Sequence, residues 1–302
     1  MTLKDLEYFE TIARYRSITR AAAELFIAQP ALSQCLQKLE KETGLQLFTR
    51  QSRGVALTPQ GECFLSFARN VLREHAEMEL RMQDVAQGEK GEIRLGFTGA
   101  QATHVLPHIL PDFQAAHPGI SIFLIEATSN DIEQKLLAHE VDVGILHLPI
   151  LCDELDWFEL SRDEMVIIPR TGADTAPHAY EKEGRNYLRP SFFQNEPLIL
   201  TPPEQRSRMI CDRMLAHADV TAQIKQVSRN LSTLDALAQV DYASTFLPEK
   251  QISPALRSRG FYYMPPQYSV PYTFVVATLK DGYLSTAVKK LCQALREKQF
   301  TF

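Results

Sequence analysis

The sequence predicts a multidomain fold, in which a small helix-rich unit is joined by a long helix to a larger α/β domain. Two observations carry this prediction. Apolar residues recur at helical spacing through about the first 85 residues, whereas short apolar strands alternate with helices from Ile93 onward. The chain has 302 residues, 45% of them hydrophobic and 23% charged, which is enough to bury more than one core.

The N-terminal segment has the pattern of three helices. The first ends near Arg16 and is indicated by apolar residues at helical spacing: Leu3, Leu6, Phe9, Ile12 and Ala13. RAAAEL forms a short second helix, and FIAQ a turn before Pro30, which stands in the first turn of a third helix because its missing N–H costs nothing there. In the third helix Leu32, Leu36 and Leu39 face the core, so polar side chains remain outside.

The helix pair and the segment after it predict a winged helix-turn-helix that binds DNA. LFTRQSRGVALTP forms two short strands around a Ser-Arg-Gly turn, the wing, whose arginines can reach phosphate or the minor groove. The second helix of a helix-turn-helix presents its N-terminal side chains to base edges, and Gln and Ser suit that contact. The predicted DNA-binding residues are Gln29, Pro30, Ser33, Gln34, Gln37, Lys38, Arg50 and Arg53.

Charge and cysteine content limit the other function classes. The net charge is -5, although residues 1 to 58 carry eight Lys/Arg against six Asp/Glu, or +2, so the DNA prediction depends on pattern and not on charge. The five cysteines are odd in number and widely spaced, which argues against a disulfide framework or a zinc knuckle. No membrane helix or signal peptide is expected, so we predict a cytoplasmic protein without membrane contact.

A long helix is expected from Pro59 to about Val85, capped by Thr58. Along it, residues spaced alternately by four and three form a heptad seam: Phe64, Ala68, Val71, His75, Met78, Met82 and Val85. The same helix of a second subunit would cover this seam, which predicts a dimer or tetramer. The alternative is that the seam packs back onto its own domain. QGEKGE, at 87–92, is the expected hinge to the next domain.

From Ile93 the alternation of strands and helices predicts an open, mostly parallel sheet with helices on both faces. Strands are expected at EIRLGF, ISIFLIE, VDVGIL, EMVIIP, PLIL, QIKQV, ASTFLP and YTFVVAT, and helices near 103–116, 131–139, 205–217 and 231–239. The segment 169–197 is rich in Pro, Gly and charge, so we expect a loop with at most one helical turn. Ligands of such sheets bind beyond the carboxyl ends of the strands.

Residues 18–61 resemble the DNA-binding segment of LysR-type transcriptional regulators. The resemblance combines the AAAEL helix, the QPALSQ helix start, the LE and GLQLF turn into the wing, an Arg after the Phe, and the RG and LTPQG exit, all at the expected intervals. The C-terminal half is similar to the effector domain of the same family through LGFTG, LLAHEVDVGI and FLP. The resemblance covers nearly the whole chain.

This resemblance implies a two-lobed, periplasmic-binding-protein-like effector domain that senses a small molecule, and an operator, double-stranded DNA, bound by the winged domain. The implied domains are 1–58, a linker and dimerisation segment at 59–90, and 91–302, with one lobe from 91–161 plus 268–302 and the other from 162–267. RNA polymerase is a further candidate partner. The polar residues that follow the strands are the predicted effector site: Thr98, Gln101, Thr103, Thr128, Ser129, Asn130, Thr201, Pro202, Arg206 and Thr245. Arg206 could hold a carboxylate, with an exposed surface arginine as the alternative.

Two segments depart from the family pattern. AQVDYASTFLP has Val240, Asp241 and Tyr242 where the family has a Gly-rich turn before its last cleft strand, which predicts a narrower cleft. The long segment 169–197 replaces a short basic-polar one.

Other function classes have less support. An enzyme lacks any catalytic motif, and a solute-binding protein would not carry the N-terminal winged domain. His104 and His108 have metal-ligand spacing but no third ligand at a suitable interval, so neither a metal nor a cofactor is expected. A redox sensor is a further alternative, in which Cys211 would react with Cys152, its nearest partner in sequence. The other explanation of Cys211 is that it is a small buried apolar residue.

Overall fold

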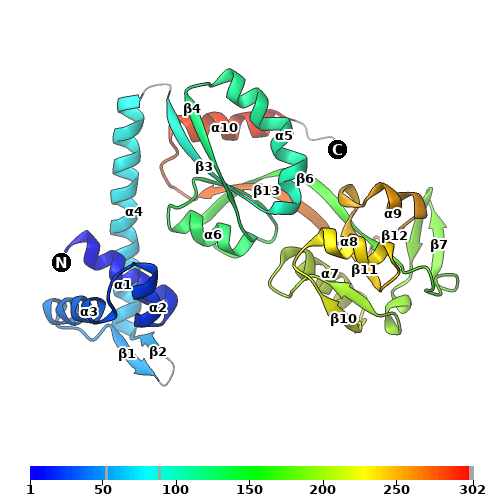
Figure 1. Ribbon diagram of the computed structural model, residues 1–302, viewed down its shortest axis with the longest axis horizontal. Helices are drawn as coiled ribbons and strands as arrows, with labels where there is room; N and C mark the ends of the chain where they lie inside the picture. The colour runs from blue at the N-terminus through cyan, green and yellow to red at the C-terminus, as the bar shows by residue number, and fades with distance from the viewer. Residues whose placement is uncertain (52–53, 88–89, 299–302) are drawn as a thin grey trace. The chain divides into compact units, whose positions relative to one another are not determined.

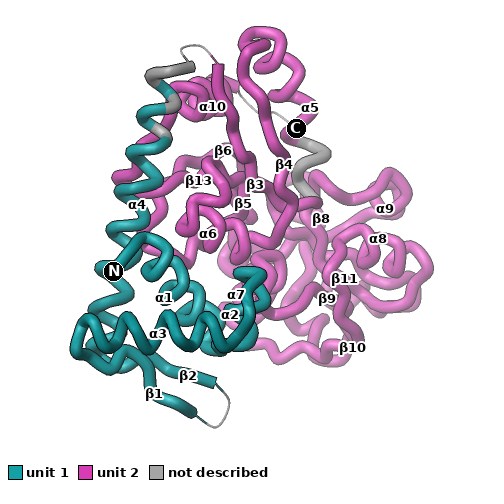
Figure 2. Tube along the Cα trace, turned by 60° about the vertical axis from the view of Figure 1, so that its left-hand side comes forward, with its two compact units in different colours: residues 1–86 teal, residues 87–302 magenta. Residues whose placement is uncertain are grey.

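The computed structural model describes residues 1–51, 54–87 and 90–298. The chain divides into two compact units, unit 1 at Met1–Ala86 and unit 2 at Gln87–Phe302 (Figure 2). None of the described helices is both long enough and apolar enough to cross a membrane.

Unit 1 has the predicted helices, hairpin and long helix (Figure 1). Its elements are α1 (Leu3–Tyr15), α2 (Ile18–Glu24), α3 (Gln29–Thr43), β1 (Phe48–Gln51), β2 (Gly54–Leu57) and α4 (Pro59–Gln87). Thr2 and Asp5 form a capping box that starts α1, and Gly44 ends α3 in the left-handed conformation at φ 68°. One apolar cluster joins all these elements and includes Phe9, Leu32 and Leu47.

The hairpin is fixed to the third helix by a side chain of that helix. Glu40 Oε1 accepts hydrogen bonds from the backbone N–H groups of Leu47 at 2.7 Å and Phe48 at 3.2 Å. At the same open end of the hairpin, Thr58 donates to the Gln46 carbonyl at 2.7 Å, which ties the residue after β2 to the segment before β1. The carboxylate satisfies two backbone donors at the start of β1, so the wing and α3 are positioned together.

Unit 2 contains the remaining elements. In chain order they are β3 (Gly91–Phe97), α5 (Gly99–Ala116), β4 (Ile120–Glu126), α6 (Ser129–Leu137), β5 (Val143–His147), β6 (Leu155–Ile168), β7 (Ala179–Lys182), β8 (Arg185–Leu188), η1 (Pro190–Gln194), β9 (Leu198–Leu200), α7 (Arg206–His217), β10 (Ile224–Val227), α8 (Leu231–Gln239), β11 (Ser244–Pro248), η2 (Glu249–Gln251), α9 (Pro254–Arg259), β12 (Tyr262–Tyr263), β13 (Pro271–Leu279) and α10 (Thr286–Glu297).

These strands form an 11-stranded sheet within the described residues, with the main order β10-β9-β11-β6-β13-β5-β3-β4. β3 pairs in parallel with β4 and β5, and β9 pairs in parallel with β10 and β11. Between these groups, β6 and β13 are antiparallel to each other and to their outer neighbours. The expectation of a mostly parallel sheet is corrected to a mixed one, because the chain crosses between the groups in both directions.

The crossing strands divide unit 2 into two lobes. Residues 155–164 of β6 pair with β13, and residues 165–168 pair with β11. The first lobe comprises β3, β4 and β5 with α5, α6 and α10, and the second comprises β7 to β12 with α7, α8 and α9. Core residues alternate between two clusters in each lobe: Phe274 belongs to one cluster and Val275 to the other, so helices cover both faces of the sheet.

Several sequence expectations about elements were wrong, including the expectation of no element between Pro248 and Tyr272, where η2, α9 and β12 lie. β6 begins at Leu155, nine residues before the expected strand at 164; among its first seven residues only Leu155 is buried, so this half lacks the apolar run by which a buried strand is recognised. The segment 169–197 contains the β7–β8 hairpin and the 3-10 helix η1, and its turn has Glu183 and Gly184 both at positive φ, 54° and 75°. Our expectation also assigned no element after residue 278, where α10 begins behind the Ser285 cap and buries Val288, Leu291 and Leu295.

Candidate functional site

The exposed face of α3 carries the side chains predicted to contact DNA. Leu32, Leu36 and Leu39 are buried in unit 1, whereas the polar positions on the opposite side are exposed or half-buried: Gln29, Pro30, Ser33, Gln34, Gln37 and Lys38. Gln29 Nε2 donates to Ser33 Oγ at 2.8 Å, which links two of them one helical turn apart. The N-cap residue Ala28 has no side-chain cap, so the positive end of the α3 dipole is open to an anion such as a phosphate.

Of the two arginines predicted for the wing, the structure describes Arg50. Arg50 is exposed on β1 and is paired in register with Val55 of β2. Arg53 lies outside the described residues. Because Glu40 fixes β1 to α3, Arg50 has a defined position relative to the exposed helix face.

The predicted seam of α4 is divided between two environments. Phe64, Ala68 and Val71 pack in the apolar cluster of unit 1, Ala68 without any exposed surface. Met78 and Met82 are 48% and 65% exposed. The side chain of Val85 lies outside those described. Packing onto its own domain, the alternative weighed for this seam, therefore accounts for its first half, and an apolar strip remains on its second half.

A buried arginine connects the two lobes of unit 2. Arg206, the first residue of α7, donates through Nη2 to Glu133 of α6 at 2.5 Å, and both side chains are 2% exposed. Its Nη1 donates to Asn130 Oδ1 at 2.7 Å, and its Nε donates to the Pro149 carbonyl at 2.7 Å. All three guanidinium nitrogens are thus bound to the first lobe, so the exposed-arginine alternative is excluded.

Glu133 is the residue of this network that the sequence analysis missed. Its second carboxylate oxygen accepts from the backbone N–H groups of Leu151 at 2.9 Å and Cys152 at 3.1 Å. The only signal in the sequence is its position on α6, three residues after Asn130 and on the same helix face. The arginine expected to hold a ligand carboxylate therefore holds one from the protein itself.

Most other predicted effector residues already have partners inside the protein. Thr128 caps α6 and donates to Asp131 at 2.7 Å, Thr201 shares a hydrogen bond with Ser207 at 2.8 Å, and Thr245 donates to a β9 carbonyl at 2.7 Å. Ser129 and Pro202 are buried. The hydroxyl groups of these residues are therefore used to hold the strands and the turns beside them in place.

Thr98 differs from these residues. It occupies the N-cap position of α5 without forming a side-chain cap, and its Oγ1 is buried with no hydrogen-bond partner among the described residues. A buried hydroxyl without a partner is costly, so it marks a point where a polar ligand atom would be favoured. The side chains of Gln101 and Thr103, on the same helix, lie outside those described.

The family is decided by comparison with known proteins. The LysR substrate binding domain matches residues 86–299, and the bacterial regulatory helix-turn-helix protein of the lysR family matches residues 3–62. The chain belongs to the LysR family. It is a DNA-binding transcriptional regulator with an effector-binding domain, which confirms the fold class and the function class expected from the sequence.

LysR-type relatives cover the chain end to end. The Hca operon transcriptional activator HcaR of Escherichia coli (strain K12) is 27% identical over 300 residues, which is 99% of this chain and 98% of that protein. The uncharacterized HTH-type transcriptional regulator YcgK of Bacillus subtilis (strain 168) is 28% identical over 98% of this chain and 94% of that one. Full-length BenM has the same fold, with a TM-score of 0.55, 23% identity, and coverage of 98% of this chain and 96% of that one.

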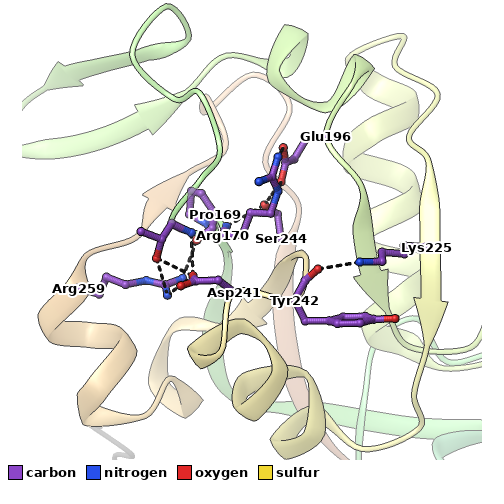
Figure 3. A network of polar contacts seen from close by, with 9 residues as sticks. Pro169, Arg170, Glu196, Lys225, Asp241, Tyr242, Ser244 and Arg259 are labelled. Carbon is purple, nitrogen blue, oxygen red and sulfur yellow. Dashed lines mark hydrogen bonds and ion pairs between the residues drawn. The ribbon is translucent and has the colours of Figure 1, made fainter.

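Asp241 and Tyr242, two of the three residues that depart from the LysR pattern, belong to a polar network in the second lobe (Figure 3). Asp241 accepts from the backbone N–H and the hydroxyl of Thr171, at 2.7 and 2.6 Å, and from Arg259 at 2.8 Å. The hydrogen bonds to Thr171 hold the pKa of Asp241 below its usual value. These contacts tie the turn before β11 to the segment that follows β6.

The redox reading of LysR-type function has little support in the geometry. Cys211 is 2% exposed, and burial raises the pKa of its thiol far above the usual range. Burial, followed by hydrogen bonding to Glu133, raises the pKa of Cys152 to about 11. Neither thiol forms the reactive thiolate near neutral pH, so Cys211 fits the buried apolar alternative.

The metal reading has no further support either. The described residues contain no group of three or more His, Cys, Asp or Glu side chains placed to hold a metal ion. The side chain of His104 lies outside those described.

Removing the charge of Glu133 leaves Arg206 buried and uncompensated. We expect Glu133→Gln to lower the free energy of unfolding of unit 2 by about 3–5 kcal/mol, the range for breaking a buried ion pair. Trp157, the single tryptophan, lies on β6 and reports this transition by fluorescence in urea.

Two further variants control this measurement. Glu140→Gln breaks an ion pair with Lys135 whose side chains are 44% and 36% exposed, so its cost should stay below about 1 kcal/mol. The double variant Glu133→Met with Arg206→Leu removes both charges and should recover part of the loss; the rest persists because the backbone N–H groups of Leu151 and Cys152 lose their acceptor. Equal effects of the Glu133 and Glu140 substitutions would contradict the assigned role.

Proposed function

We propose that the protein is a ligand-responsive regulator that binds an interrupted inverted-repeat operator through α3 and the wing, and senses a small polar or anionic metabolite between the lobes of unit 2. The observation that carries the DNA part is the exposed polar face of α3 beside an uncapped helix start. CbnR, whose complex with its target DNA has the same fold at a TM-score of 0.50, supports the use of this domain on DNA. This function also implies RNA polymerase as a partner. Because operator DNA lies in the cytoplasm of a bacterium, the same function implies a cytoplasmic protein as well.

We propose 1–58 for DNA binding, 59–90 for dimerisation and linkage, and 91–302 for effector binding, with lobes at 91–161 plus 268–302 and at 162–267. Residues 1–86 form one compact unit, which supports the view that α4 packs with the DNA-binding domain. The exposed part of α4 supports its separate role in assembly.

The effector proposal depends on two observations in unit 2. The Thr98 hydroxyl, which has no hydrogen-bond partner among the residues that the structure describes, offers a polar contact, and the Arg206–Glu133 pair joins the lobes. A metabolite that contacts Thr98 and disturbs the pair would favour one arrangement of the lobes over another. Its influence on DNA binding equals its difference in affinity for the two arrangements, typically about 1–3 kcal/mol.

Footprinting on a bound promoter tests the DNA proposal. We expect two half-sites separated by whole helical turns, roughly 34 Å for one turn, because a symmetric dimer presents two copies of α3. Gln34→Ala should relax base preference in the half-site, costing about 1–3 kcal/mol of discrimination, because a glutamine amide can pair bidentately with adenine. A single unrepeated site protected by one monomer would contradict the proposal.

Arg50→Ala is the control for Gln34→Ala. Since its guanidinium would contact phosphate, this variant should weaken specific and random DNA alike and reduce the slope of log K against log salt by about 1. If Gln34→Ala also weakened both kinds of DNA equally, its role in base recognition would be refuted.

The apolar strip on the second half of α4 is proposed as part of the dimer contact. It consists of the exposed Met78 and Met82 together with the half-buried His75. Met78→Glu should dissociate the dimer because two carboxylates would be forced into one apolar contact, where an unpaired charge costs several kcal/mol. Light scattering measures the mass. Ser66→Glu places the same charge on an exposed position of α4 off the seam and should leave the mass unchanged. A Met78→Glu variant that stays dimeric would move the interface elsewhere.

Thr98→Ala should abolish the effector response while basal operator affinity is retained, because Thr98 lies in unit 2 and outside the winged domain. A thermal-shift screen of metabolites first supplies the compound, since binding at 100 times Kd adds about 2.7 kcal/mol of stability. Reporter activity with and without that compound, and gel-shift affinity, are then compared with Thr233→Ala, an exposed threonine of α8. A full response from Thr98→Ala would place the effector elsewhere.

A further inference from the structure

The turn of the helix-turn-helix carries an aromatic side chain in an unfavourable setting. Phe26 is 96% exposed, the largest exposed fraction among the exposed large apolar side chains of the described residues. Its backbone is left-handed, with φ at 53°. Both properties are unfavourable for phenylalanine, because a side chain with a Cβ is strained in this region and a large ring prefers burial.

The backbone explains where the strain arises. The N–H of Phe26 donates to the Ala23 carbonyl at 3.2 Å, and the N–H of Ile27 donates to the Ala22 carbonyl at 3.0 Å. This pair of hydrogen bonds is the Schellman motif that ends a helix, and Phe26 occupies its left-handed position. Glycine or asparagine is favoured there, so phenylalanine is not selected by the needs of the turn.

The surroundings of Phe26 indicate what the ring would contact. It lies three residues before Gln29, the first residue of α3, and next to the uncapped start of that helix. Its neighbour Ile27 packs toward the core of unit 1, whereas the Phe26 ring does not. The ring therefore lies at the surface of unit 1, close in sequence to the exposed polar residues at the start of α3, the part of a recognition helix that meets DNA.

We infer that Phe26 is a DNA-contacting residue that packs against an apolar edge of the duplex, either a thymine methyl group or a deoxyribose. The inference rests on the proposed DNA-binding face of α3 and adds an apolar contact to its polar ones. Thymine methyl groups are recognised by apolar side chains in the major groove, and burial of part of a phenyl ring is worth about tenfold in affinity. The local strain is retained because the ring is needed outside the protein.

The test uses Phe26→Asn in the full chain, because this variant separates stability from binding. Asparagine suits the left-handed position, so hydrogen exchange of the α2 and α3 amides should slow relative to the natural chain. Operator affinity, measured by fluorescence anisotropy, should nevertheless fall about tenfold. A variant that gains protection and binds the operator with unchanged affinity would overturn the inference.

Two controls distinguish the outcomes. Glu183→Asn relieves the same backbone conformation, at φ 54°, on an exposed turn of unit 2, and should leave operator affinity unchanged. Phe26→Leu keeps an apolar side chain and should retain most of the affinity. If Phe26→Asn instead lowered the mass seen in sedimentation without DNA, the ring would contact a second copy of the chain, and the inference would be wrong.

The source of the apolar contact is resolved with modified DNA. Replacing operator thymines with deoxyuridine removes only the methyl groups. If deoxyuridine lowers the affinity of the natural chain but not the affinity of Phe26→Asn, the ring contacts a methyl group. If deoxyuridine has no effect on either protein while Phe26→Asn remains weak, the contact is to deoxyribose. Failure of the DNA proposal itself would appear separately, as unchanged affinity in Gln34→Ala and Arg50→Ala.

Discussion

The ion pair between Arg206 and Glu133 is the most deeply buried ion pair among the described residues, and it joins the two lobes of the effector domain. Both groups are buried, so each depends on the other for compensation of its charge. Burial, together with the charge of Arg206, lowers the pKa of nearby His147 to about 3, which keeps that imidazole neutral over the physiological range. The network thus contains one full positive and one full negative charge. Any rearrangement of the lobes must either keep this pair intact or supply another anion to Arg206.

The DNA-binding unit is organised around a different carboxylate. Glu40 binds the start of β1 to the C-terminal half of α3, so the helix and the wing form one rigid element. The side chains on their exposed surface are then presented with fixed spacing, and little ordering entropy remains to be lost on binding. The hydrogen bond from Thr58 to the Gln46 carbonyl likewise fixes the start of α4 to the hairpin. The protein therefore meets its DNA with a preorganised surface.

Periodicity in the sequence located nearly all of unit 1, because its helices bury one apolar side and some of their caps use typical residues, such as Thr2 and Gly44. It failed at β6, whose first half has a single buried residue among its first seven, and at the β7–β8 hairpin, whose Glu183-Gly184 turn is not a common signal. Among the residues predicted for the effector site, Thr98, Thr128 and Thr201 follow strands as expected, whereas Thr245 lies within β11. Their pairing was not predictable, since Glu133 reaches Arg206 across 73 positions of the chain.

The strands β6 and β13 also define the mechanics of unit 2. Sliding one along the other is stiff, because a shift of one residue would turn every side chain to the opposite face of the sheet. Twisting is softer, since narrow ribbons accept a wider range of twist than broad sheets. The softest relative motion of the lobes is therefore a rotation about the ribbon axis. A rotation of this kind leaves the hydrogen-bonded register unchanged and moves atoms most where they lie farthest from the ribbon.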